Sequence, residues 1–175
     1  MKRTLALTVG GLLLIGSAAG CATGRGAVTR VTPPKAPLGE YTGLAITSTM
    51  VPGLKLTDTD RARIVALVVE TLQQRAPGRF TLTLPAGPGT LHATIAFREY
   101  DEGSRVARAF LAGAGKMRIA ADVFIEDRAR KLTLGTYDVT KTFAWGGLYG
   151  ATTELKDIEQ GFADAVVAAL LGETS

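Results

Sequence analysis

Hydrophobic and polar residues alternate along five segments downstream of residue 40. Such alternation is typical of β-strands with one buried face, because successive side chains of a strand point to opposite faces. In one of these segments Leu91, Ala93, Ile95 and Phe97 share a face, and His92 falls on the outward face, where a surface histidine is expected. The five segments are 41–50, 79–84, 91–100, 116–127 and 132–145.

Two further segments carry apolar residues at the three- and four-residue spacing of amphipathic helices. The first, residues 59–76, starts after capping and acidic residues and stops at an Ala-Pro-Gly sequence. The second ends at Gly172, a residue suited to a helix terminus. Their apolar positions are Ile64, Val65, Val68 and Leu72 in the first, and Leu155, Ile158, Phe162, Val166 and Leu170 in the second.

The order strand, helix, several strands, helix predicts an α+β fold. We expect a mainly antiparallel sheet of about five strands with two helices packed on one face. The last three strands follow one another through short turns, as in an antiparallel meander, and Gly135 indicates a bulge in the last strand. Residues 41–175 are predicted to form this single domain.

The start of the chain is typical of a bacterial secretory signal. Lys2 and Arg3 precede an apolar run from Leu5 to Ile15, and small residues lead up to Cys21, the only cysteine. The run is shorter than the roughly 20 residues of a membrane-spanning helix. Residues 1–20 are therefore predicted to be a signal peptide.

The residues before Cys21 are similar to the lipobox of bacterial lipoproteins, with Ala18 where that motif has a branched apolar residue. The resemblance implies that Cys21 carries lipid and anchors the chain to a membrane. With Ala22 after the cysteine, it implies the outer membrane, facing the periplasm. Residues 21–40 would then be a flexible linker, given their paired prolines and lack of apolar periodicity. The alternative is an ordinary signal peptide with Cys21 as a free thiol.

Charge argues against a nucleic-acid partner. The chain has a formal net charge of +4, and loss of Lys2 and Arg3 with the signal peptide leaves +2, with acidic and basic residues interleaved. The sequence GAGK at 113–116 lacks the earlier glycine and the following Ser or Thr of a phosphate-binding loop, and it leads into a predicted strand. No nucleotide is therefore expected.

The sequence also offers no catalytic or metal-binding set. His92 is the only histidine, and neither a zinc site nor a serine triad can be assembled around it from recognisable spacing. Glu99, Asp101 and Glu102 form an acidic group that lacks the ligand spacing of a calcium loop. We expect no metal, no cofactor and no enzymatic activity, and we assign no catalytic residue.

Residues 98–127 contain a strand, a GxR turn, an arginine-containing stretch, a GxGK turn and an alternating strand, with characteristic positions at Gly103, Arg105, Arg108, Gly113, Gly115 and Lys116. In this pattern and at these positions the segment resembles the domain-of-unknown-function 4410 family of small bacterial envelope lipoproteins. The resemblance extends over most of Tyr41 to Leu171. It implies an envelope location and this architecture, and it supplies no catalytic residues.

Four side chains are candidates for contact with a partner or an anion: Arg105, Arg108, Lys116 and Tyr149. The arginines lie beside glycines and could form an anion-receiving edge, or their stems could simply cover apolar surface. Tyr149 belongs to an aromatic and glycine-rich stretch, residues 142–150, whose Phe143 and Trp145 are expected in the core.

These observations predict a membrane-tethered envelope lipoprotein that binds another envelope protein or assembles with copies of itself. Two alternatives stay open. One is a hydrolase or glycan-acting enzyme with its site near Glu99 to Glu102. The other is a subunit of a membrane pore or transport complex, in which residues 105–115 insert or oligomerise.

Overall fold

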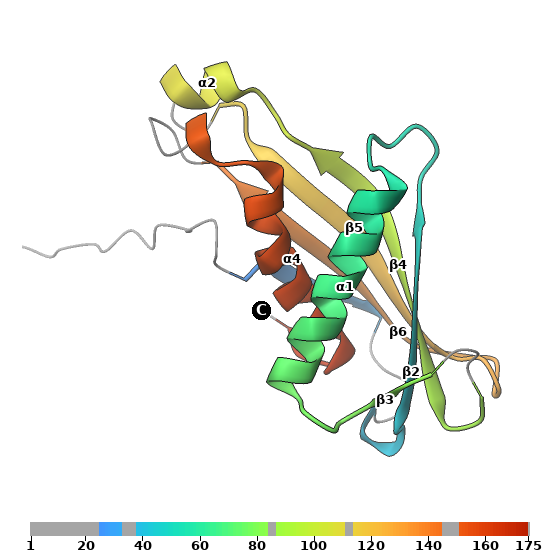
Figure 1. The fold of residues 1–175 in the computed structure, drawn as a ribbon. Coiled ribbons are helices and arrows are strands. Elements are labelled where there is room, and N and C mark those ends of the chain that lie inside the picture. The colour runs from blue at the N-terminus through green and yellow to red at the C-terminus, as the bar shows by residue number, and fades with distance from the viewer. Residues whose placement is uncertain (1–24, 33–37, 84–86, 111–113, 145–150, 175) are drawn as a thin grey trace, which may run out of the picture.

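The computed structural model describes residues 25–32, 38–83, 87–110, 114–144 and 151–174, which form a sheet with helices on one side (Figure 1). The strands are β1 Ala27–Thr32, β2 Gly43–Met50, β3 Thr81–Leu82, β4 Thr90–Asp101, β5 Met117–Asp127 and β6 Leu132–Phe143. The helices are α1 Asp58–Arg75, α2 Arg105–Phe110 and α4 Leu155–Leu170, with a 3-10 turn, η1, at Leu38–Glu40.

The strands form one six-stranded mixed sheet in the order β1-β6-β5-β4-β2-β3. Strands β4, β5 and β6 make the predicted antiparallel meander, and β1 adds to it antiparallel. Strand β2, however, pairs parallel with both β4 and β3. The prediction of an α+β fold is confirmed, while a mainly antiparallel sheet of five strands is only roughly right. The difference arises because α1 carries the chain back over the sheet after β2, and such a crossover makes neighbouring strands parallel.

Strand β1 lies inside the segment that the sequence predicts to be a flexible linker. Val28 is buried, and the amide of Gly26 donates a 2.7 Å hydrogen bond to the carbonyl of Gly161 in α4. The predicted flexible linker, residues 21–40, is therefore wrong for the residues of β1, Ala27–Thr32. The physical reason is that an edge strand buries few side chains: in β1 only Val28 is fully buried, which leaves no visible alternation.

Helices α1 and α4 lie side by side on the same face of the sheet, as predicted (Figure 1). They run in the same direction, since Arg63 meets Glu159 near their starts and Arg75 meets Glu173 just beyond the end of α4. The rings of Phe97 in β4 and Phe162 in α4 lie 5.7 Å apart between their centroids, so the core is continuous from sheet to helix. The apolar positions predicted for α4 are all buried: Leu155, Ile158, Phe162, Val166 and Leu170.

The structure confirms the prediction made for Gly135 and contradicts the one made for His92. Gly135 lies at a register shift between β5 and β6, which confirms the predicted bulge. His92 is only 4% exposed, so the prediction of a surface histidine is wrong. Its neighbours in register are Ala45 on β2 and Glu126 on β5, and burial lowers its pKa, with the nearby charge of Arg128 adding to the effect. The imidazole is therefore favoured as the neutral form.

Candidate functional site

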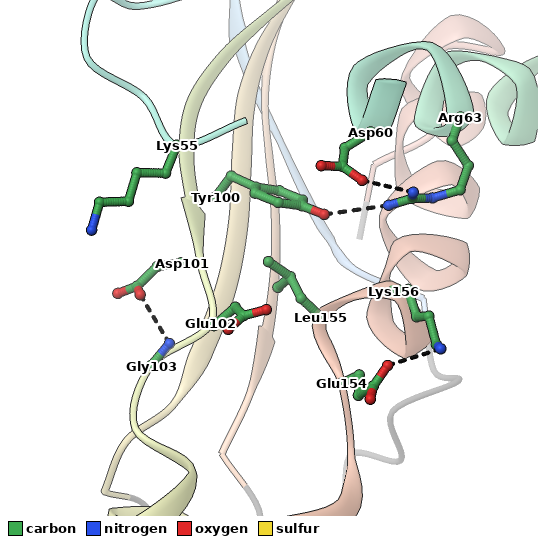
Figure 2. Close-up of a pocket in the computed structure, with 10 residues that line it drawn as sticks. All are labelled: Lys55, Asp60, Arg63, Tyr100, Asp101, Glu102, Gly103, Glu154, Leu155 and Lys156. Carbon is green, nitrogen blue, oxygen red and sulfur yellow. Dashed lines mark hydrogen bonds and ion pairs between the residues drawn. The ribbon is translucent and has the colours of Figure 1, made fainter. Parts of the chain in front are cut away.

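A polar cavity of about 540 Å³ opens where the α1 start, the end of β4 and the start of α4 meet (Figure 2). Charged groups of both signs surround it, and Tyr100 and Leu155 supply the apolar part of its wall. The lining residues are Lys55, Asp60, Arg63, Tyr100, Asp101, Glu102, Gly103, Glu154, Leu155 and Lys156.

A β-bulge turns Tyr100 towards the helices. The β4–β5 register shifts between Phe97 and Glu99, so that Phe97 pairs with Ala121 while Glu99 pairs with Ala120. The extra residue reverses the alternation, because a bulge places two successive side chains on the same side. Glu99 consequently faces away from the helices and pairs with Arg118 at 3.3 Å.

Tyr100 and Arg63 converge on a buried carboxylate, that of Glu159, which is 1% exposed. Arg63 donates from Nε at 2.9 Å and from Nη2 at 2.6 Å to its two oxygens, and the Tyr100 hydroxyl donates at 2.8 Å. Such a two-pronged arginine pair is among the stronger hydrogen-bonded ion pairs in proteins. We name these three residues the Glu159 cluster; it ties α1, β4 and α4 together.

The two hydrogen-bond donors of the Glu159 cluster, Arg63 and Tyr100, have raised pKa values. Burial, and next the hydrogen bond to Glu159, raise the pKa of Tyr100, so that its hydroxyl stays protonated. The hydrogen bond to Glu159 likewise raises the pKa of Arg63. Arg63 also contacts Asp60 at 2.7 Å, and a hydrogen bond from the Thr57 hydroxyl lowers the pKa of that aspartate. Tyr100 and Arg63 therefore keep their protons at neutral pH while Asp60 stays ionised, and all three act as structural links.

The rim of the cavity is charged and more exposed. Lys156 pairs with Glu154 at 2.8 Å, which lowers the pKa of Glu154 and raises that of Lys156 (Figure 2). Glu154 is also the N-cap of α4, where its main-chain amide donates to Asp157 at 2.7 Å. Within the described part of the chain, no group of three or more His, Cys, Asp or Glu side chains could hold a metal ion.

The acidic group 99–102 does not form a pair of carboxylates facing one another across this cavity. Glu99 lies on the opposite face of the sheet, and Asp101 accepts a 2.9 Å hydrogen bond from the amide of Gly103. Asp101 and Glu102 both line the cavity, from consecutive positions of the chain. Acid-base hydrolysis of a glycosidic bond needs two carboxyl groups on either side of the scissile bond, and residues 99–102 do not take such positions among themselves.

Arg108 is buried by the fold, and its predicted role in contact with a partner or anion is wrong. It is 1% exposed, and its guanidinium donates to the carbonyls of Glu102 at 2.5 Å, Gly115 at 2.8 Å and Thr153 at 3.4 Å. These carbonyls belong to the segments before α2, before β5 and before α4. Arg108 therefore joins three chain segments at one end of the sheet.

The other candidates differ in where they lie. Arg105 is exposed on α2 and approaches Glu154 at 3.9 Å, and Lys116 is exposed directly before β5. Both stay predicted contact residues. Cys21, Gly113, Trp145 and Tyr149 lie outside the described residues. Phe143, expected in the core, is buried.

Gly103 and Gly115 flank the segment that carries Arg108, and both have a backbone conformation that favours glycine. Gly103 has a φ of +58°, and a Cβ there would lie 2.2 Å from the carbonyl oxygen of Lys116. We expect Gly103→Ala to lower the free energy of unfolding by about 3 kcal/mol, through strain and overlap together. Gly89→Ala is the control: its φ is +74° but its surroundings are open, so about 1 kcal/mol is expected. Urea unfolding measures both, and equal losses would contradict the prediction.

A second recess, apolar in character, lies between α1 and the β2–β3 edge of the sheet. Its volume is about 320 Å³, and its wall consists of Leu44, Ile46, Val65, Val69, Leu82 and Thr83. It continues along β2 past Ala62 and Ala66 of α1. Val65, predicted for the buried face of α1, is half-buried and belongs to this recess. We name the whole recess the α1–β2 groove.

Arg63, Tyr100 and Glu159 are functional-site residues that no sequence motif predicted. One signal was available for Glu159: it sits beside Ile158 and three residues before Phe162, on the apolar face of α4. A charged residue in such a position needs a partner of opposite charge when it is buried. The identity of that partner, 96 positions earlier in the chain, required the tertiary structure.

Residues 56–147 match the family model of a domain of unknown function, DUF4410. The chain belongs to the DUF4410 family. This match covers more than half of the chain and confirms the resemblance seen in residues 98–127. No curated protein matches the chain in sequence.

Solved structures share the fold of this DUF4410 protein. One is the PelC dodecamer from Paraburkholderia phytofirmans, 12% identical, with a TM-score of 0.56 over 86% of this chain and 100% of that chain. A point-substituted PelC dodecamer from the same organism is 13% identical, with a TM-score of 0.53 over 86% and 99%. A DUF330 protein from Xanthomonas campestris is 15% identical, with a TM-score of 0.43 over 84% and 90%. At these identities the PelC structures show a shared fold.

Proposed function

We propose that this DUF4410 protein is a non-enzymatic, lipid-anchored protein of the bacterial envelope whose domain assembles with copies of itself. The observation that carries the proposal is the α1–β2 groove. Val65 and Val69 are half-buried there, while Ala62 and Ala66 are exposed, so an apolar stripe of α1 faces solvent at a sheet edge. Apolar patches of this kind mark interaction surfaces.

The fold comparison supports self-association as the kind of interaction. PelC from Paraburkholderia phytofirmans is described as a dodecamer, and the likeness spans that entire chain. The polar cavity supports a non-enzymatic role. The buried carboxylate of Glu159, which two lining residues of the cavity contact, is engaged by Arg63 and Tyr100, and this leaves it unsuited to proton transfer.

The position of β1 makes the proposed tether short. Only four residue steps separate Cys21 from Arg25, the first described residue. At no more than about 3.5 Å per residue, this spans at most about 14 Å. A lipid on Cys21 would therefore hold the domain at the membrane surface, which we place at the outer membrane, facing the periplasm. None of the described helices is long and apolar enough to cross a bilayer.

A second candidate function is a subunit of a membrane pore or transport complex. It is favoured by α2, where Val106 is 69% exposed and Phe110 is 82% exposed, four positions apart on one helix face. These two side chains suit contact with a bilayer surface or with a partner at that end of the sheet.

The test is intact and native mass spectrometry of the full-length protein expressed in a two-membrane bacterium and extracted in mild detergent. We expect a chain cut before Cys21, carrying acyl groups, in the membrane fraction and in a multi-copy complex. Cys21→Ser should be released from the membrane or stay unprocessed. An unmodified thiol in a soluble chain would overturn the anchor, and a monomer at the membrane would overturn self-assembly.

A further inference from the structure

We propose that neighbouring copies join through opposite edges of the sheet, the α1–β2 groove of one copy receiving the β1 edge of the next. This inference rests on the proposed self-assembly and specifies its interface. The two edges are far apart in the strand order, with β1 at one end and β2 and β3 at the other.

The groove lies along an edge that is left largely uncovered. Strand β3 consists of two residues and pairs only with Gly43 and Leu44 of β2. Beyond that point, β2 from Ile46 to Met50 has no strand on its outer side among the described residues. Exposed edges of this kind are templates for association with another chain.

Side chains of α1 close the groove from above. Ala62, Val65, Ala66 and Val69 recur at three- and four-residue spacing, so they share one helix face. This face is distinct from the buried one, which carries Ile64, Val68 and Leu72. Arg61 donates at 3.0 Å to the carbonyl of Ser48 on β2, which blocks a main-chain acceptor that an added strand would need. The groove is therefore suited to receive apolar side chains rather than to extend the sheet.

The β1 edge offers an apolar side chain that fits this requirement. The β1–β6 register shifts between Arg30 and Thr32, which leaves Val31 outside the ladder as a bulged residue. Val31 is 60% exposed. A bulge on an edge strand re-aims its side chain, and here it presents an apolar group at the rim of the molecule.

Charges beside the two surfaces are complementary. Next to Val31, Arg30 donates to the carbonyl of Gly172 and stacks 5.8 Å from the Tyr137 ring, with no carboxylate partner among the described residues. Next to Val69, Glu70 accepts a hydrogen bond from Gln74 and has no cationic partner in the same described part of the chain. An Arg30–Glu70 contact between copies would satisfy both and fix the orientation.

Two different surfaces on opposite edges make the contact head-to-tail. Every copy then offers one groove and one β1 edge, and repetition around an axis closes into a ring when the rotation permits. A symmetric dimer would instead bring the same patch of each copy together. The number of copies is set by the angle between the two edges.

The experiment mixes two defective copies. Ala66→Glu places a charge in the groove but keeps the β1 edge intact, whereas Val31→Glu does the reverse. Ala129→Glu, on the exposed β5–β6 turn, is the matched control. Each lipidated full-length protein is extracted in mild detergent and examined by native mass spectrometry, with thermal unfolding as a check of folding.

We expect the wild-type protein and the Ala129→Glu control to give the multi-copy complex, and each interface variant alone to give a monomer. An equal mixture of Ala66→Glu and Val31→Glu should give a heterodimer, because the intact β1 edge of the first variant can enter the intact groove of the second. Assembly should stop there, because the two surfaces left free on the heterodimer both carry the added charge. Should Ala66→Glu fail to fold, Ala62→Glu on the same stripe takes its place.

Several outcomes would overturn the inference. Interface variants that still form the full complex would show that the edges are not used. A mixture that stays monomeric, or that returns to the full complex, would exclude a head-to-tail contact between these two surfaces. A wild-type protein that is itself monomeric at the membrane would overturn the proposed self-assembly instead, which separates the two failures.

Discussion

Arg63→Met is expected to lower the free energy of unfolding by about 3–5 kcal/mol, because it leaves the buried Glu159 carboxylate without its cation. Glu159 is 1% exposed, and among the side chains of the described residues the Tyr100 hydroxyl would remain as its hydrogen-bond donor. Glu159→Gln should cost much less, about 1–2 kcal/mol. The amide oxygen of the glutamine can still accept a hydrogen bond from Tyr100. The Arg63 side chain is 42% exposed, so it stays hydrated and keeps its ion pair with Asp60.

Urea unfolding followed by circular dichroism measures this asymmetry. The double variant Arg63→Met with Glu159→Gln removes the stranded charge and should be more stable than Arg63→Met alone, so the two substitutions should not be additive. Equal losses for the two single variants, or simple additivity in the double variant, would show that the Glu159 cluster does not act as a buried ion pair.

Arg108→Met is expected to destabilise the domain by a similar amount, about 3–5 kcal/mol. The substitution keeps most of the apolar stem but deprives the carbonyls of Glu102, Gly115 and Thr153 of their donor. Each buried acceptor left unsatisfied costs about 1–3 kcal/mol. Arg108→Lys should fall between the two, because an ammonium cannot reproduce the planar fork of the guanidinium.

Arg105→Met is the matched control for this second prediction. Arg105 lies one turn earlier on the same helix, its side chain is 59% exposed, and its approach to Glu154 is long, at 3.9 Å. A change of less than about 0.5 kcal/mol is expected there. Chemical denaturation of both variants provides the comparison, and similar losses at the two arginines would refute the structural role assigned to Arg108.

Arg105 and Arg108 also show the limit of motif-based prediction. Their spacing in the sequence suggests two equivalent arginines beside glycines, and both were candidates for external contact. They lie three positions apart on α2, a spacing that places both side chains on roughly the same side of a helix, so helix geometry does not separate them. One reaches solvent and the other the carbonyls of three chain segments. Only the packing of these segments distinguishes them.

Tyr100 illustrates a second limit. Alternation correctly predicts the inward residues of the first part of β4. These residues, Leu91, Ala93, Ile95 and Phe97, are all fully buried. The bulge after Phe97 then reverses the pattern and brings Tyr100 to Glu159. A bulge depends on the strand's partner as well as on its own residues, so periodicity within β4 could not reveal it.

The sequence by itself determined the α+β class, the two long helices with their buried faces, the β4–β5–β6 meander and membership of the DUF4410 family. These follow from periodicities of two and 3.6 residues and from local motifs, which act over short stretches of chain. The tertiary structure decided the β1 edge strand, the parallel pairing of β2, the Glu159 cluster and the burial of Arg108. Each of these depends on contacts between residues distant in sequence, such as Arg63 with Glu159, and no local pattern specifies which distant partner a side chain will meet.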